Sequence, residues 1–266
     1  EKRVITSYLA GKNNGAVILS EDEGTSVLLN GEDHVRIQVL CNGMDIQSCF
    51  KKANEIDDYI DAHFDYAFDE KYGYKTTFPT NTGTGMKAGY TLHLPSLSDA
   101  RRLNDISAEL GRFGLKFRTV YGDGQNGYGN LYQISTQKTL GQDEREVIKD
   151  LDDIVLQIVN QEKEQREHFY KKDKIQMDDE IYKSYGVLKY ARKLSLKDSM
   201  VLISELMTGV SLGVLQFAHN GRYNINELIM DIQPAVLRQN SGKAMSVAET
   251  DVLRAEYIRK YLPEII

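Results

Sequence analysis

Acidic residues lie in a turn immediately before a strand that carries a cation. Residues 30–38 place Glu32 and Asp33 in the turn and Arg36 in the strand. Carboxylates bind cationic groups, and an arginine can bind a phosphate group through two parallel hydrogen bonds. Taken alone, the segment is more typical of a polar hairpin, so its interpretation depends on two further segments.

Two glycine-containing loops also lie next to strand-borne cations. Residues 79–89 form a loop rich in Gly and Thr, with Lys87 near its end. Residues 117–124 place Arg118 before a glycine loop that contains Asp123. Backbone amides and hydroxyls of such loops can approach a phosphate group closely. We therefore expect the three cations to lie on neighbouring strands and to form a phosphate clamp that faces a pair of carboxylates.

Residues 122–127 match the Gly-x-Gly-x-x-Gly pattern of dinucleotide-binding proteins. In those proteins the pattern opens a helix. Here it leads into residues 128–134, whose composition and alternation predict a strand. We therefore expect a flexible glycine loop beside a ligand and no dinucleotide fold. A Walker loop is also excluded, because no glycine loop in the sequence ends in Gly-Lys-Ser or Gly-Lys-Thr.

The elements that must position these residues change in type along the chain. Short β-branched runs predict an antiparallel meander, further strands follow with two amphipathic helices, and the pattern from Asp143 onward is almost entirely helical. The expected strands are 16–19, 25–29, 35–40, 89–94, 115–121 and 130–135. The expected helices are 46–60, 98–112, 181–191, 196–207, 225–232 and 247–261, with one more that starts near Asp143.

A boundary near Glu167 divides the chain into two expected domains. Residues 1–167 combine strands and helices, whereas residues 168–266 are typical of helices alone. The polar run 161–174 between them indicates a solvated extension or linker. The predicted fold class is α+β, with an antiparallel sheet flanked by helices and followed by a small all-helical domain.

Composition excludes several classes of function. The formal net charge of -6 over 266 residues argues against nonspecific binding to nucleic acid. No run approaches the roughly 20 apolar residues that a membrane span requires, so we expect a cytoplasmic protein without a membrane segment. Cys41 and Cys49 could pair, but two thiols give no disulfide framework in a chain of this length. We expect both to be small buried hydrophobic residues.

Together, these segments resemble the phosphagen kinase superfamily, which transfers phosphoryl groups between ATP and guanidino compounds. Within it, the chain is similar to the bacterial protein-arginine kinases over nearly its whole length, including helical C-terminal residues that other phosphagen kinases lack. The resemblance implies the catalytic fold of that superfamily, which is like that of glutamine synthetase. The family's N-terminal segment, with two more phosphate-binding arginines, is absent from these 266 residues. The matching segments are 66–70, 73–74, 93–95, 129–135 and 184–188.

The resemblance implies roles for individual residues. Glu32 and Asp123 would hold the acceptor guanidinium group. Arg36, Lys87 and Arg118 would bind the phosphates of ATP, with Mg²⁺ as cofactor and no side chain assigned to the metal. Such groups suit phosphoryl transfer, which depends mainly on alignment and charge stabilisation. The loop residues expected beside the nucleotide are Thr84, Gly85, Met86, Ala88, Gly89, Tyr90, Thr119, Val120, Tyr121 and Gly122.

Three positions depart from the family pattern. Phe78 occupies the place of a reactive cysteine, and Lys87 replaces an arginine and lacks its planar fork. Asp123 is one methylene shorter than the glutamate of the family. Losing one positioned donor typically costs on the order of 10² to 10³ in rate, so these changes bear directly on activity.

The C-terminal part contains a variant of the family's phosphoarginine-binding motif. Asp251 and Arg254 are in place, whereas Thr250 replaces one cation. The resemblance implies that Arg254 meets a phosphoryl group and Asp251 a guanidinium group. An ordinary surface pair on a helix is an equal alternative.

The implied function is that of a protein-arginine kinase, which marks exposed arginines of proteins for Clp-type proteolysis in the stress response and protein quality control. The implied partners are the Clp ATPase and protease system, an activator protein and a second copy of the chain in a homodimer. One alternative is a weak or inactive pseudokinase that acts as an adaptor binding nucleotide or phosphoarginine. Another is a kinase for free arginine or a similar small guanidine, which the C-terminal helices disfavour.

Overall fold

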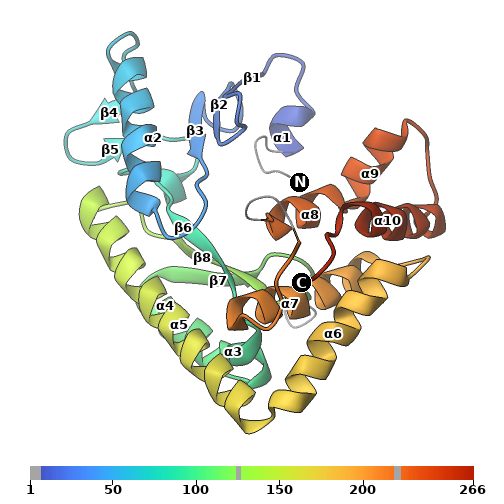
Figure 1. Cartoon of the computed structure of the whole chain (residues 1–266). Coiled ribbons are helices and arrows are strands. Elements are labelled where there is room, and N and C mark those ends of the chain that lie inside the picture. The colour runs from blue at the N-terminus through green and yellow to red at the C-terminus, as the bar shows by residue number, and fades with distance from the viewer. Residues whose placement is uncertain (1–6, 124–126, 219–222) are drawn as a thin grey trace.

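The computed structural model describes residues 7–123, 127–218 and 223–266. Figure 1 shows strands and helices in blue to green, followed by the long helix α5 and then by helices alone in yellow to red. The strands are β1 (Ala16–Leu19), β2 (Thr25–Leu29), β3 (Val35–Val39), β4 (Phe68–Asp69), β5 (Gly73–Tyr74), β6 (Gly89–His93), β7 (Leu115–Thr119) and β8 (Leu131–Thr136). The helices of the first part are α1 (Ser7–Ala10), α2 (Ile46–Asp61), the short 3₁₀ helix η1 (Pro79–Asn81), α3 (Pro95–Asp99) and α4 (Leu103–Arg112). The remaining helices are α5 (Glu144–Lys172), α6 (Lys174–Tyr190), α7 (Leu196–Leu212), α8 (Ile225–Asp231), α9 (Pro234–Ser241) and α10 (Val247–Tyr261). The predicted α+β class is confirmed.

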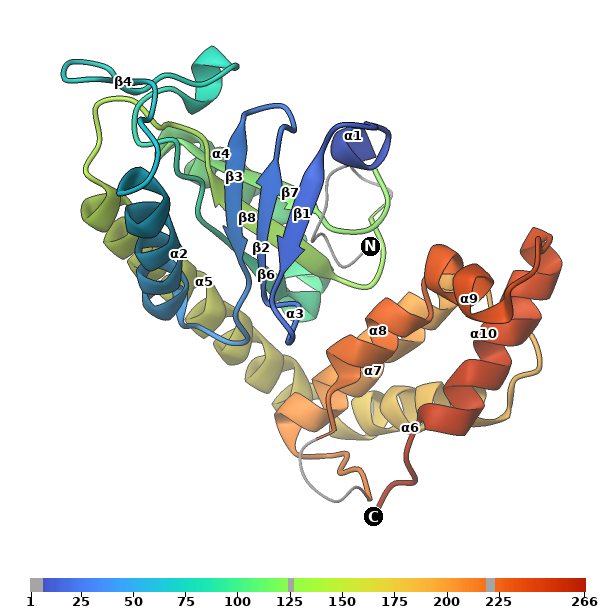
Figure 2. The ribbon, with the colours of Figure 1, turned by 90° about the horizontal axis from the view of Figure 1, so that it is seen from above.

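The first sheet is an antiparallel meander in the order β1-β2-β3, as the β-branched runs predicted. Leu28 pairs with Arg36, and Leu29 pairs with Val35, so the β2–β3 turn begins directly after Leu29. Figure 2 shows α2 running beside β3 at one edge of this sheet. The turn that carries Glu32 is therefore held at the end of a regular two-stranded ladder.

The second sheet has the order β6-β8-β7, also antiparallel, and its two faces differ in polarity. Tyr90 and Leu92 of β6 and Ile134 of β8 lie in a core cluster with α5. Because side chains alternate along a strand, the residues between them point to the opposite face. Helices α4 and α5 pack on this sheet (Figure 1), and the face away from its apolar cluster is polar.

The helix predicted over 98–112 is two helices in the structure. α3 ends at Asp99 and α4 begins at Leu103. Between them, Arg101 takes a left-handed conformation with φ of 57°, which a continuous right-handed helix does not allow.

The polar run 161–174 was predicted to be a solvated extension or linker; most of its residues are exposed, but the run is helical and includes one buried acid. It forms the last turns of α5, where Glu162 is only 2% exposed. The carboxylate of Glu162 accepts the backbone N–H groups of Ser96 and Leu97, at 3.1 and 2.9 Å. A polar run on one helix thus supplies the buried acceptor that fixes the start of another. The boundary predicted near Glu167 falls inside α5 and stays a prediction.

The C-terminal helices pack around a second apolar cluster. Ile181 and Leu188 of α6 meet Ile203 and Leu206 of α7, together with Ile258 of α10. α10 begins with a capping box, in which Ser246 and Glu249 satisfy each other's backbone N–H groups. In the described residues, no helix is both long enough and apolar enough to cross a membrane.

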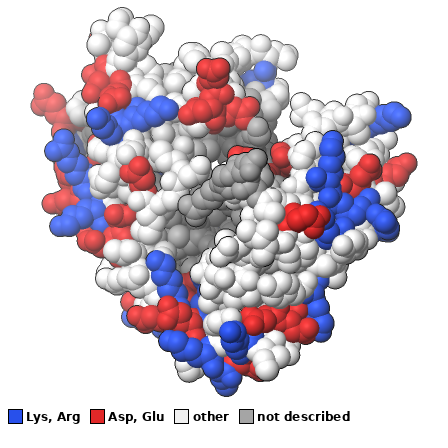
Figure 3. Space-filling model, viewed as in Figure 1, with Lys and Arg blue, Asp and Glu red and all other residues white. Residues whose placement is uncertain are grey.

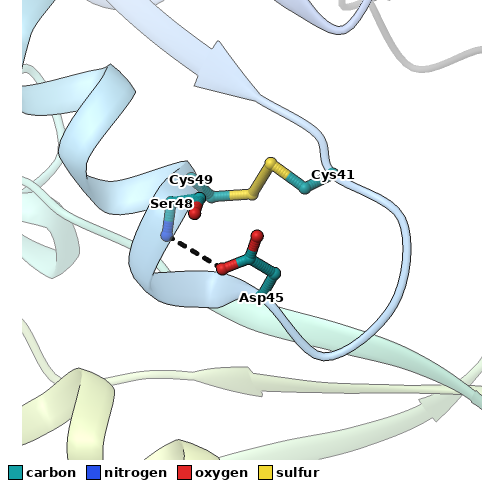
Figure 4. The surroundings of a disulfide bond; sticks show 4 residues. All are labelled: Cys41, Asp45, Ser48 and Cys49. Carbon is teal, nitrogen blue, oxygen red and sulfur yellow. Dashed lines mark hydrogen bonds between the residues drawn. A yellow bond between two sulfur atoms is a disulfide. The ribbon is translucent and has the colours of Figure 1, made fainter.

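Cys41 and Cys49 form a disulfide, so the prediction of two buried thiols is wrong. Their Cα atoms lie 6.2 Å apart, with Cys41 exposed and Cys49 half-buried. Figure 4 shows that the bond joins the segment after β3 to the first turn of α2, where Asp45 caps the helix by accepting the N–H of Ser48. The cross-link closes a short loop next to the strand that carries Arg36.

Candidate active site

The acidic turn between β2 and β3 is ordered by backbone contacts. Asn30 has a φ of 56°, and its N–H donates to the carbonyl of His34 at 2.8 Å. Lys12 donates to the carbonyls of Asn30 and Gly31. Asparagine adopts this left-handed conformation more readily than most residues. The Glu32 side chain is exposed at the tip of the turn, where it can meet a ligand.

A second segment is tied to this turn through Thr77. The N–H of Thr77 donates to Oδ1 of Asp33 at 2.7 Å, and its hydroxyl donates to the carbonyl of Glu32 at 2.8 Å. The next residue is Phe78, whose side chain is 46% exposed. Phe78, which the resemblance predicts to stand in the place of a reactive cysteine, therefore follows directly on the contact with the acidic turn.

The polar face of the second sheet presents cations in rows. Arg118 pairs with Gln133, which in turn pairs with Thr91. The Nε of Arg118 donates to Oε1 of Gln133 at 2.7 Å, which orients the guanidinium group. Lys116 lies in the neighbouring row and is exposed on the same face.

Lys116 was not predicted, because the cations chosen from the sequence were those next to an acidic turn or a glycine loop. The alternation in residues 115–119 could have revealed it, because Lys116 and Arg118 are two positions apart on one strand. A second cation beside Arg118 adds positive charge to the polar face.

The three predicted cations do not lie on neighbouring strands, which corrects the sequence analysis. Lys87 precedes β6 and Arg118 lies on β7, with β8 between these strands. Arg36 belongs to β3 in the other sheet. Within the residues that the structure describes, no hydrogen bond or ion pair joins these cations to Glu32 or Asp123.

The loop before β6 is partly exposed, whereas Tyr90 at the start of the strand is buried. Gly85 has a φ of 65°, and the Thr84 hydroxyl accepts the N–H of Met86 at 3.2 Å. Tyr90, in contrast, is buried, and its hydroxyl donates to Asp152 of α5. Burial and this carboxylate raise the pKa of the Tyr90 phenol. Tyr90 thus points to the core face of the sheet, and its place in the nucleotide loop stays a prediction.

The glycine loop after β7 begins beside the C-terminal helices. Val120 and Tyr121 pack against the second apolar cluster, and the Thr119 hydroxyl donates to the carbonyl of Gly122. Asp123 is exposed just beyond this contact. The rest of the predicted flexible loop, residues 124–126, lies outside the described residues.

Arg254 is buried and bonded inside the protein. The sequence had suggested either a phosphoryl-binding residue or an ordinary surface pair. The Arg254 side chain is 1% exposed. It donates to the carbonyls of Ile232 and Leu194 and to Oδ1 of Asp251, at 3.0, 2.9 and 2.6 Å. Thr250 is buried as well, and its hydroxyl donates to Ser246. With its donors facing internal acceptors, Arg254 is not presented to a phosphoryl group in this structure.

Comparison with known proteins identifies two family models along the chain. The model described as "ATP:guanido phosphotransferase, C-terminal catalytic domain" matches residues 1–165. The model described as "Protein-arginine kinase McsB C-terminal domain" matches residues 174–265.

Relatives of known name match almost the whole chain. The protein-arginine kinase of Bacillus subtilis (strain 168) is 40% identical over 262 residues, which are 98% of this chain and 72% of that protein. The protein-arginine kinase of Geobacillus sp. (strain WCH70) is 41% identical over 263 residues, with the same shares. Among solved structures, the duplicated taurocyamine kinase of Schistosoma mansoni with bound transition-state-analogue components gives a TM-score of 0.51 at 27% identity, over 59% of this chain and 22% of that one.

Proposed function

The chain belongs to the ATP:guanido phosphotransferase family, and from that premise we propose that it transfers the γ-phosphoryl group of ATP to arginine side chains of proteins. Membership of the family makes it a kinase of guanidino compounds with ATP as the phosphoryl donor. The choice of protein-bound arginine rests on the C-terminal helices, which match a domain of protein-arginine kinases over residues 174–265.

The observation that carries the proposal within the site is the fixed acidic turn. Thr77 holds the backbone of Glu32 and the side chain of Asp33, while the Glu32 carboxylate stays exposed. A carboxylate can accept two parallel hydrogen bonds from a guanidinium group. Glu32 therefore positions the acceptor nitrogen, and Asp123 is the second carboxylate that approaches it when substrate binds.

Cations on the two sheets serve the nucleotide. Arg118, with Lys116 beside it, neutralises phosphate oxygens from the polar face of the second sheet, while Arg36 approaches from β3 and Lys87 from the loop before β6. Charge spreads over the phosphoryl oxygens during transfer, so positioned cations lower the barrier.

Mg²⁺ fits this site as an ion that is bound by the phosphates of the nucleotide. The described residues contain no group of three His, Cys, Asp or Glu side chains that could hold a metal. Magnesium commonly keeps several waters and binds through substrate phosphates. Bound in that way, it would neutralise phosphate charge during transfer.

We further propose the cellular setting that the resemblance in sequence implies. The arginine phosphorylation marks proteins for a Clp ATPase and protease in the cytoplasm, as part of the stress response and quality control. An activator protein and a homodimer through the C-terminal helices belong to the same proposal.

The test is direct detection of phosphoarginine by mass spectrometry under conditions that preserve the acid-labile bond. The purified protein is incubated with MgATP and an unfolded arginine-containing protein. Glu32→Gln should lower product formation by about 10² or more. Glu21→Gln is the matched control, because Glu21 is an exposed acid in a different turn and should leave activity unchanged.

The alternative of a pseudokinase is favoured by Phe78, Lys87 and Asp123, which depart from the family pattern. It predicts that ATP binds without turnover and that the combined change Lys87→Arg and Asp123→Glu creates activity. Product from the unmodified protein that vanishes in Glu32→Gln rules the pseudokinase out.

A further inference from the structure

A cluster of exposed aromatic rings lies next to the acidic turn. Three of the four exposed phenylalanines, Phe64, Phe68 and Phe78, fall within 15 residues, and Phe64 and Phe68 are 70% and 54% exposed. Tyr72 of the β4–β5 turn is 50% exposed, and Nζ of Lys71 lies 5.1 Å from the centroid of its ring. Exposed apolar residues scattered singly need no explanation, whereas a contiguous group marks an interaction surface.

The same segment is strongly acidic. Residues 53–70 contain seven Asp or Glu and no Lys or Arg. Figure 3 shows acidic side chains at the upper left, over α2 and the β4–β5 hairpin, with uncharged surface and some Lys or Arg side chains next to them. Lys75 follows the segment and lies 3.7 Å from Asp69. We call the exposed rings Phe64, Phe68, Tyr72 and Phe78, with the exposed acids of residues 53–70, the acidic aromatic surface.

The rings stand on a fixed base. Asp57 of α2 accepts the hydroxyls of Tyr66 and Tyr74, at 2.9 and 3.2 Å. Tyr74 packs edge to face against both Tyr66 and Phe68, with ring centroids 5.5 and 5.2 Å apart. Burial and Asp57 raise the pKa of Tyr74 to about 12, so its hydroxyl remains a donor at neutral pH. A preorganised surface loses less conformational entropy on binding.

The surface is continuous with the proposed guanidinium site. Tyr74 pairs with Gly83, and Lys75 donates to the carbonyl of Ala67 at 2.7 Å, which fixes the hairpin. Two residues later, Thr77 bonds to Glu32 and Asp33. A polypeptide whose arginine reaches Glu32 therefore has its flanking residues next to these rings and carboxylates.

We propose that the acidic aromatic surface docks an unfolded polypeptide segment in which apolar residues alternate with arginines. The proposal rests on the proposed function for the identity of the modified residue. Guanidinium groups stack on aromatic faces and pair with carboxylates, and apolar side chains gain by leaving water against the phenylalanines. A second copy of the chain would bring acid against acid, and a surface of anionic lipid would be repelled.

The test measures peptide binding without ATP. Fluorescence anisotropy compares a labelled peptide of alternating arginine and leucine with a peptide in which serine replaces each leucine. The protein should bind the leucine peptide more tightly. The double change Phe64→Ser and Phe68→Ser should weaken its binding about tenfold or more and leave the serine peptide unaffected.

Phe113→Ser is the matched control, since Phe113 directly follows α4, is 62% exposed and lies outside this surface. Urea unfolding checks that all variants keep their stability, as expected for exposed positions. Equal affinity of the double variant and the unchanged protein for the leucine peptide overturns the proposal, and so does failure of the unchanged protein to bind it.

Kinetics separate this proposal from the proposed function. In the double variant, KM for an unfolded protein substrate should rise about tenfold with kcat retained. If the double variant loses peptide binding but the unchanged protein forms no phosphoarginine, the docking surface is supported and the proposed kinase activity is wrong. If phosphoarginine forms and the double variant has an unchanged KM, the proposed kinase activity is supported and the docking surface is wrong.

Discussion

The N–H of Thr77 donates a 2.7 Å hydrogen bond to Oδ1 of Asp33, which joins two segments more than 40 residues apart in the sequence. The Thr77 hydroxyl makes the second contact, to the carbonyl of Glu32. Asp33 is thus a positioning residue, because it fixes the turn on which the Glu32 carboxylate is carried.

Replacing Asp33 by alanine should lower kcat/KM for arginine phosphorylation about 10- to 100-fold, since a shift of about 1 Å in a reacting group can cost that much. Asp33→Asn keeps the Oδ1 acceptor and should restore most of the activity. The measurement is steady-state kinetics of both variants. If Asp33 only supports the fold, Asp33→Ala should lower the free energy of unfolding as well as the activity. If Asp33→Ala and Asp33→Asn have the same kinetics, Asp33 is not a positioning residue.

Local patterns predicted most of the elements that position the site. The β-branched runs predicted β1, β2 and β3 within a residue, because such runs and the polar turns between them are properties of neighbouring residues. The exposed acid of Glu32 also followed from its place in a turn.

Contacts between distant segments could not be predicted from such patterns. Glu162 and Arg254 are charged residues on helices that look solvated in sequence, yet both are buried. Their partners Ser96 and Leu194 are about 60 residues or more away. The Cys41–Cys49 disulfide was missed for a different reason, since counting cysteines says nothing about where two of them fold.

Removing the Arg254 guanidinium should destabilise the helical part strongly. Arg254→Met keeps much of the volume but leaves two carbonyls and the Asp251 carboxylate without their donors. We expect a loss of about 3 kcal/mol or more in the free energy of unfolding, measured by urea denaturation.

Arg238→Met provides the control for Arg254, since Arg238 is an exposed arginine in the last turn of α9, and its cost should be under about 0.5 kcal/mol. If Arg254→Met were as stable as the control and lost affinity only for phosphoarginine, the buried environment described above would be refuted and the binding role restored.

His93 links the end of β6 to α7. Its Nε2 lies 2.8 Å from the Ser204 hydroxyl, which also accepts the side-chain amide of Asn130 at 3.1 Å. Burial, with a smaller contribution from the Arg166 charge, lowers the pKa of His93 to about 3. In the folded protein His93 is therefore neutral at every pH near neutrality, whereas in the unfolded chain it can take up a proton.

The sign of the resulting pH dependence follows from proton linkage. Since the unfolded His93 protonates near its ordinary pKa of about 6.5 and the folded one does not, lowering the pH from about 7 to about 5 should cost about 2 kcal/mol of unfolding free energy. Glu205 acts in the opposite direction, because burial together with Glu180 and Asp99 raises its pKa to about 7, so the folded chain holds a proton that the unfolded chain releases. The unchanged protein and His93→Gln both contain Glu205, so its contribution to the pH dependence cancels when the two are compared. Urea denaturation at the two pH values should show His93→Gln losing about 2 kcal/mol less than the unchanged protein, whereas an equal loss in both would mean that His93 takes up its proton in the folded state and that the contact with Ser204 does not exclude water.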